Sequence, residues 1–250
     1  MRTQREKIAA LMREGNYFEA LQQIHRLEAE TIEDWTYCYL SGECYRMLHN
    51  LDYAQFYLAQ ANAQREGNIE ILHSLGMVYE EMGWYKDAIE TFKSVVELDP
   101  DMLSIYHRIG ILYARNGDPV EALIWFDKGL AQIEALYRRG VGSLEEMLHE
   151  RRRKAMTIFE HVFPHGQIDA CSDIEFFKSL FNNDMGVCYM EIGDKHQAEA
   201  WFLKSVKSMP ERVRFDDPFV YLRKMPHRER WWKESSAEDT ECQAEDAKIE

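Results

Sequence analysis

Apolar and polar positions along the chain follow the period of an α-helix. In residues 72–98, LHSLGMVYEEMGWYKDAIETFKSVVEL, apolar side chains recur every three or four positions on both sides of Gly83. This spacing predicts two short amphipathic helices joined by a tight turn. The β-branched alternation that marks strands is rare elsewhere in the sequence. We therefore predict an all-α protein.

The same pattern returns at a step of 34 residues. Four units run in register, over about 1–34, 35–68, 69–102 and 103–136, and a fifth follows after a gap. The repeated positions are Gly42, Gly76, Gly110 and Gly186; Tyr45, Tyr79, Tyr113 and Tyr189; Ala20, Ala54, Ala88, Ala122 and Ala198; and Gly15, Gly83, Gly117 and Gly193. One helix pair cannot bury its apolar faces alone, so the units are expected to stack into a solenoid.

Each repeated residue type has a physical role in such a unit. Gly83 and Gly117 supply the φ freedom that ends the first helix. Gly76 and Gly110 are expected to be small because another backbone comes close there. The aromatic residue of the second helix, such as Phe92, fills the space between helices.

These residues resemble the tetratricopeptide repeat (TPR) family, and the resemblance covers roughly 170 of the 250 residues. It implies a right-handed superhelical solenoid of helix-turn-helix repeats. One extra inserted helix and a C-terminal capping helix complete the expected fold.

The expected organisation has five parts. They are TPR units one to four (1–136), an inserted helix and linker (137–178), TPR unit five (179–210), a C-terminal cap (211–232) and an acidic tail expected to be disordered (233–250). The inserted helix is predicted over 144–163. A single extra helix either packs on a face of the solenoid or displaces unit five from the regular superhelix.

The charge and cysteine content narrow the function classes. With 44 acidic and 30 basic residues, the formal charge is −14, which disfavours nonspecific binding to nucleic acid or to anionic membranes. Five cysteines without a CxxC pair fit a reducing compartment. No signal-peptide pattern and no apolar run of about 18 residues is present, so we expect a cytoplasmic protein without membrane insertion.

Catalytic and metal-binding patterns fail on inspection. His149-Glu150 begins like HExxH, but Arg153 occupies the place of the second ligand. His161 and His165 are separated by Pro164, which breaks the helix that would align them. No phosphate-binding glycine loop and no GxSxG occurs. We expect no enzyme activity and no cofactor.

The resemblance implies that the first helices line a concave groove that holds a peptide or a helix of a partner protein. Carried over position by position, the partner-binding residues are Tyr39, Leu40, Arg46, Met47, His73, Met77, His107, Arg108, Ile111 and Arg115. Tyr39, Leu40, Met47, Met77 and Ile111 would form an apolar track. Arg46, His107, Arg108 and Arg115 would pair with carboxylates of the ligand.

A second candidate surface is basic. Arg151, Arg152, Arg153 and Lys154 lie in the predicted inserted helix. They form either a solvated face paired to neighbouring acids or a site for an anionic partner.

Three functions fit these patterns. The first is an interaction scaffold, adaptor or chaperone-like module that binds a protein or peptide in the groove. The second is a self-associating assembly protein, a homo-oligomer docked through the extra helix or through Trp231 and Trp232. The third is a regulatory subunit that acts through the basic helix.

Overall fold

The computed structural model describes residues 4–31, 35–140 and 174–209, which form helices and connecting turns without a strand. The helices are α1 (Gln4–Arg13), α2 (Tyr17–Thr31), α3 (Trp35–Met47), α4 (Leu51–Gln64), α5 (Ile69–Glu81), α6 (Tyr85–Leu98), α7 (Leu103–Arg115), α8 (Pro119–Arg138), α10 (Ile174–Ile192) and α11 (Lys195–Lys207). The all-α prediction is confirmed. The predicted inserted helix, the C-terminal cap and the acidic tail lie outside the described residues.

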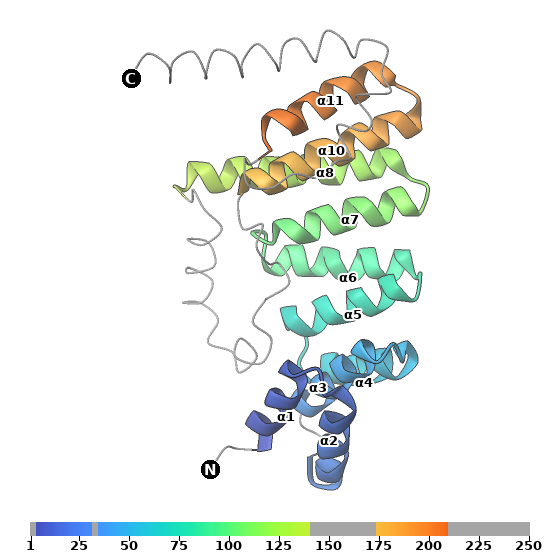
Figure 1. Cartoon of the computed structure of the whole chain (residues 1–250), viewed down its shortest axis with the longest axis vertical. Helices are drawn as coiled ribbons and strands as arrows, with labels where there is room; N and C mark the ends of the chain where they lie inside the picture. Colours follow the sequence, from blue (N-terminus) through green and yellow to red (C-terminus); the bar gives the residue numbers. More distant parts are fainter. Residues whose placement is uncertain (1–3, 32–34, 141–173, 210–250) are drawn as a thin grey trace, which may run out of the picture.

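The helices form five pairs that stack along the long axis of the molecule, from the blue N-terminal pair to the orange C-terminal pair (Figure 1). Within each pair the two helices are antiparallel neighbours. Between pairs, α2 packs on α3, α4 on α5, α6 on α7 and α8 on α10. Each pair thus buries its apolar faces against the next, and the predicted solenoid is confirmed.

Unit five continues the stack directly from unit four. Helix α10 packs against α8 and also touches α7, although residues 139–173 separate α8 from α10 in the sequence. A Cβ atom at Gly129 of α8 would lie 2.4 Å from the ring of Phe181 in α10. The contact needs a glycine at this position, since any side chain there would meet the ring.

The repeated glycine in the first helices of units two to five accommodates a side chain of the second helix. A Cβ at Gly76 would lie 2.6 Å from the Phe92 ring, and one at Gly110 only 2.2 Å from the Phe126 ring. The sequence predicted the close approach of a backbone; the structure instead places an aromatic ring there. Both rings are fully buried, so the small residue lets the bulk of each ring fill the centre of its unit.

Five turns close the first helices with the same hydrogen bonds. In unit three, the Trp84 N–H donates to the Tyr79 carbonyl oxygen at 2.8 Å, and Gly83 adopts φ +76°. This is the helix-ending arrangement that favours glycine in the left-handed region. Unit two makes the equivalent bond from Asn50 to Tyr45, but its turn residue is His49, at φ +54°.

Two large clusters of buried apolar side chains run through the stack. The N-terminal core cluster lies among α1–α5, and the C-terminal core cluster lies among α6–α8 and α10. Tyr79 packs against both. Among the described helices, none has the length and apolar character needed to cross a bilayer. The apolar side chains are used to hold the pairs together, which leaves one face of the first helices for the candidate site.

Candidate partner-binding surface

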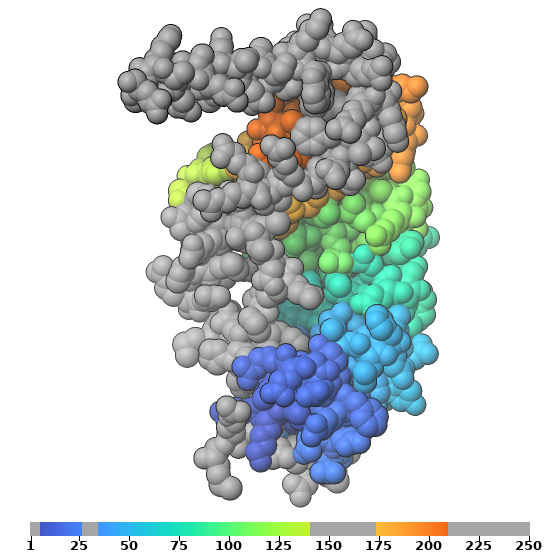
Figure 2. Space-filling model, viewed as in Figure 1, coloured from blue at the N-terminus to red at the C-terminus, as the bar shows by residue number. Residues whose placement is uncertain are grey.

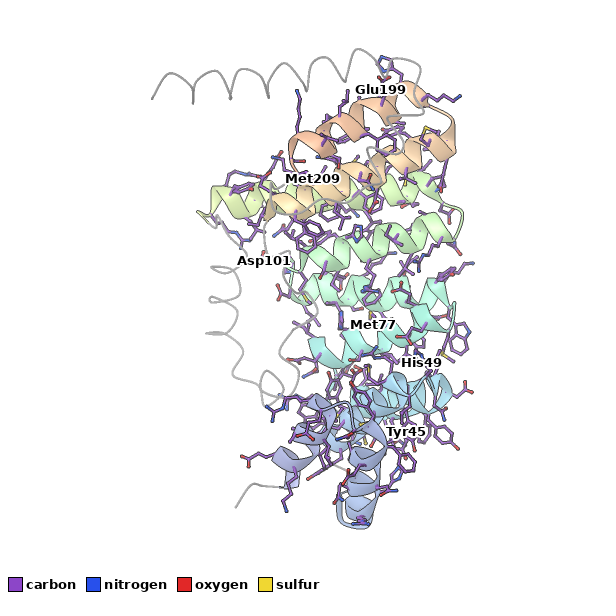
Figure 3. The ribbon with its side chains drawn as sticks, viewed as in Figure 1. Tyr45, His49, Met77, Asp101, Glu199 and Met209 are labelled. Carbon is purple, nitrogen blue, oxygen red and sulfur yellow. The ribbon has the colours of Figure 1, made fainter. Side chains whose placement is uncertain are left out.

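The predicted partner-binding residues come from equivalent positions of successive first helices. We call this surface the first-helix face and define it by Arg46 and Met47 of α3, His73, Met77, Glu80 and Glu81 of α5, His107, Arg108, Ile111 and Arg115 of α7, and Asp184 of α10. Figure 3 shows Met77 within the stack, inward of the turns that carry His49.

Tyr39 and Leu40 are not surface residues, contrary to the expectation that they form part of an apolar track. Only 5% of Tyr39 and 2% of Leu40 is exposed, and both belong to the N-terminal core cluster. The Tyr39 hydroxyl lies 3.5 Å from Ser74 Oγ, because α5 packs beside α3. Burial, with Glu43 nearby, raises the pKa of Tyr39 well above its usual value. Both side chains therefore serve packing.

Arg46 links units two and three. Its guanidinium donates to Glu43 at 2.9 Å and to Glu81 of α5 at 3.2 Å. Burial alone would disfavour the charged form, but the two carboxylates more than offset it, and the pKa of Arg46 is raised above its usual value. The predicted cation is present on the first-helix face, already paired with two acids.

Arg108 and Arg115 converge on one carboxylate of the preceding unit. Arg108 Nη1 donates to Glu80 Oε2 at 2.6 Å, and Arg115 Nη1 donates to Glu80 Oε1 at 3.2 Å. The Glu80 side chain is 13% exposed, whereas that of Arg115 is 55% exposed. Glu80 is thus held by both arginines and connects α5 to α7.

His107 connects units four and five. Its Nε2 makes a short contact with Asp184 Oδ2, and its ring lies edge-on to Phe181 at 5.8 Å between centroids. Asp184 Oδ1 also accepts a hydrogen bond from Asn183 Nδ2 at 3.1 Å. The structure brings together residues 77 positions apart, a pairing that sequence analysis did not identify.

The remaining predicted residues are partly apolar. Met77 and Ile111 are half-buried and pack on the C-terminal core, and His73 is half-buried, with its ring centroid 6.0 Å from that of Phe92. Met47 is 38% exposed at the end of α3. The apolar part of the first-helix face is therefore Met47, Met77 and Ile111, one residue from each of three successive units.

Two further predictions concern the basic patch and the absence of a metal site. Arg151, Arg152, Arg153 and Lys154 lie outside the described residues. Within the ranges that the structure describes, no three His, Cys, Asp or Glu side chains are grouped so that they could hold a metal ion.

Comparison with known proteins shows which type of repeat the chain contains. The tetratricopeptide repeat family matches residues 69–102 and 181–211. Response regulator aspartate phosphatase E of Bacillus subtilis (strain 168) is 27% identical over 121 residues, which cover 44% of this chain and 32% of that protein. TPR repeat-containing protein YpiA of the same organism is 20% identical over 195 residues, which cover 74% of this chain and 42% of that protein. The chain spans less than half the length of these relatives.

Solved structures show the same fold at low identity. MamA residues 41 to the end from Desulfovibrio magneticus RS-1 aligns with a TM-score of 0.59 at 15% identity, covering 82% of this chain and 92% of that one. Another MamA crystal structure aligns with a TM-score of 0.57 at 12% identity, covering 80% and 92%. The 34-residue period, the stacked helix pairs and these matches agree. The chain contains repeats of the tetratricopeptide type, at residues 69–102 and 181–211.

Proposed function

We propose that the chain is a non-catalytic interaction scaffold, an adaptor or chaperone-like module whose first-helix face binds an extended segment or a helix of a partner protein. The observation that carries this proposal is the row of Met77 and Ile111, one repeat apart on successive first helices, with Met47 exposed at the end of the preceding first helix. Methionine adapts its shape to different apolar partners. A row with one contact per unit suits a ligand that runs along the stack.

The paired charges indicate how such a ligand binds. Arg46 is paired with Glu43 and Glu81, and Arg108 and Arg115 share Glu80. A ligand carboxylate that replaced Glu81 at Arg46, or Glu80 at Arg108, would do so at a cost in broken ion pairs. Apolar side chains of the partner therefore supply the anchoring contacts. The flanking charges select the orientation of the ligand.

Site-specific photo-crosslinking tests the proposed surface. A benzophenone amino acid replaces Met77, and in a matched control it replaces Ile124, which is 43% exposed on α8. In cells of the source organism, position 77 is expected to yield a discrete crosslinked partner peptide, identified by mass spectrometry, and position 124 is not. Equal crosslinking at both positions, or none at position 77, would contradict the proposal.

We also propose a cytoplasmic location. Cys44 and Cys188 are free thiols buried in the described helices. Free buried thiols are typical of proteins in a reducing compartment. Fractionation of the source cells, with an antibody against the chain, checks the location.

A further inference from the structure

The turn of unit two departs from the turns of the other units. His49 occupies the left-handed region at φ +54°, where Gly15, Gly83, Gly117 and Gly193 stand elsewhere. A residue with a Cβ atom is disfavoured in this region by roughly 1–2 kcal/mol. Strain of this kind is often retained at functional sites. The surroundings of His49 are therefore a candidate functional site.

His49 lies in the wall of a pocket between two turns. Residues 48–52 form one side, and Met82 and Trp84 of the following unit form the other, around an open space of about 540 Å³. This size falls within the range of ligand pockets, roughly 300–1,000 Å³. Figure 3 shows His49 at the edge of the stack on which the turns lie, with Tyr45 nearby. The pocket is separate from the first-helix face at Met77.

Two polar side chains of this pocket, Asn50 and Asp52, have no partner among the residues that the structure describes. Asn50 does not cap α4, and Asp52 forms none of the ion pairs of the described chain. At the position equivalent to Asn50, Asp118 accepts from Asn116 at 3.0 Å, and Asp194 accepts from the backbone N–H of Gln197 at 3.0 Å. In unit two, the Asn50 amide and the Asp52 carboxylate are exposed to solvent and accessible to a ligand.

Trp84 adds an aromatic wall. Its ring stacks on Tyr79 with centroids 5.9 Å apart, and 48% of the residue remains exposed. Beyond the pocket, Tyr53 and Phe56 of α4 are 54% and 53% exposed. In Figure 2, α4 (light blue) forms part of the outer surface. An aromatic face next to a free carboxylate attracts a guanidinium through cation–π and charge contacts.

The charge of the surrounding units favours a basic partner. Residues 35–102 contain eleven acidic and four basic residues, a formal charge of −7, which is half the charge of the whole chain. Such a field attracts a basic segment and disfavours an acidic one. We infer that the pocket between the turns of units two and three binds an arginine side chain of a partner protein, with apolar neighbours of that arginine on Tyr53 and Phe56.

A peptide titration on the full chain tests this inference. The probe is acetyl-Leu-Arg-Leu-Leu-amide, compared with its citrulline counterpart, which keeps the shape of arginine without the charge. The Trp84 indole N–H resonance, assigned by its loss in Trp84→Phe, is expected to shift saturably with the arginine peptide. The citrulline peptide should bind at least about fivefold more weakly, as expected for losing a charge contact worth about 1 kcal/mol.

Matched variants separate the pocket from net charge. Asp52→Asn is expected to weaken binding of the arginine peptide about fivefold. Asp127→Asn makes the same change in net charge at an exposed acid of α8, outside the pocket and outside residues 35–102, and should leave affinity within about twofold. Equal losses in the two variants, equal binding of the two peptides, or an unmoved Trp84 resonance would overturn the inference.

His49→Gly tests the part assigned to the strained residue. The variant is expected to melt at a higher temperature, because glycine tolerates the left-handed conformation, and to bind the arginine peptide more weakly. A more stable variant with unchanged affinity would remove His49 from the site. Crosslinking from Met77 should be unaffected by any of these changes, so the outcome for the pocket is independent of the outcome for the first-helix face.

Discussion

Units three and four place a phenylalanine ring against the glycine of the first helix, whereas unit two places Leu58 against Gly42. The turns after the first helices also differ between these units. Gly83 and Gly117 adopt the left-handed conformation at little cost, and His49 adopts it with strain. Units three and four follow one packing rule at both positions, and unit two departs from it at both.

This difference separates stability from recognition along one stack. Phe92 and Phe126 fill the centres of their units, so the strongest packing is expected between residues 69 and 138. In unit two, the departure at His49 coincides with a pocket and with exposed polar side chains that have no partner among the described residues. The regular units provide the stable framework of the stack. The departure in unit two is typical of a position where function, and not stability alone, decides the residue.

The largest effect should come from removing the ring at the junction of units four and five. Phe126 lies against Gly110, and its ring centroid is 6.1 Å from that of Phe181. Phe126→Ala is expected to lower the free energy of unfolding by about 3–5 kcal/mol. Leu58→Ala removes a smaller side chain in unit two and should cost less. Urea unfolding followed by far-UV circular dichroism measures both.

The control for this comparison is Ile124→Ala on the same helix as Phe126. Ile124 is 43% exposed, so its truncation should change stability by no more than about 0.5 kcal/mol. If Phe126→Ala cost no more than the control, the glycine–ring contact would not be what stabilises the regular units.

A smaller effect is expected from exchanging the turn residues of units two and three. His49→Gly should stabilise the protein by about 0.5–1 kcal/mol, and Gly83→His should destabilise it by about 1–2 kcal/mol. The signs are opposite because the left-handed conformation is the same in both turns while the residue differs. Thermal and urea unfolding of the two variants measure the difference. Effects of the same sign would show that something other than backbone conformation decides these turns.

The smallest effect at neutral pH concerns two buried thiols. Burial, with Glu43 nearby, raises the pKa of Cys44 to about 12, and burial, with Glu191 and Asp184 nearby, raises that of Cys188 to about 12. Both thiols therefore stay protonated at pH 8 and should resist iodoacetamide until the helices open. With rising urea, Cys44 in unit two should react before Cys188 in unit five. Mass spectrometry of the labelled peptides reads the order.

The same thiols predict the sign of a pH effect. Each has a higher pKa in the folded chain than in the unfolded chain, where the usual value is near 9.0. Their contribution to stability is complete below about pH 9 and is lost as the pH rises toward 12, because the unfolded chain releases the protons first. Urea midpoints that stay constant from pH 8 to 11 would contradict the burial of these groups.

The sequence predicted the parts of the fold that recur with its period. Gly76, Tyr79 and Gly83 return one repeat later at Gly110, Tyr113 and Gly117, so the helix pairs and turns could be located. The same period also relates two further features of the structure. His49 stands one repeat before Gly83, and Arg46 and Glu81 are opposite charges one repeat plus one residue apart.

The remaining features depend on three-dimensional packing. The resemblance places Tyr39 and Leu40 on the groove, yet both are buried in the structure, where the Tyr39 hydroxyl lies beside Ser74 of α5. The contact of His107 with Asp184 joins residues on either side of 139–173, where the period is interrupted. Neither result could follow from a helical pattern, which assigns a face to a residue but not the neighbour that covers it.

The direct packing of α10 on α8 has a consequence for how this chain can change. Because Phe181 of α10 packs on Gly129 of α8, and Asp184 of α10 contacts His107 of α7, the separation between the end of α8 and the start of α10 is set by the stack. The positions of these two ends therefore do not depend on the sequence that joins them. New functions could be exchanged at this junction without rebuilding the repeats on either side.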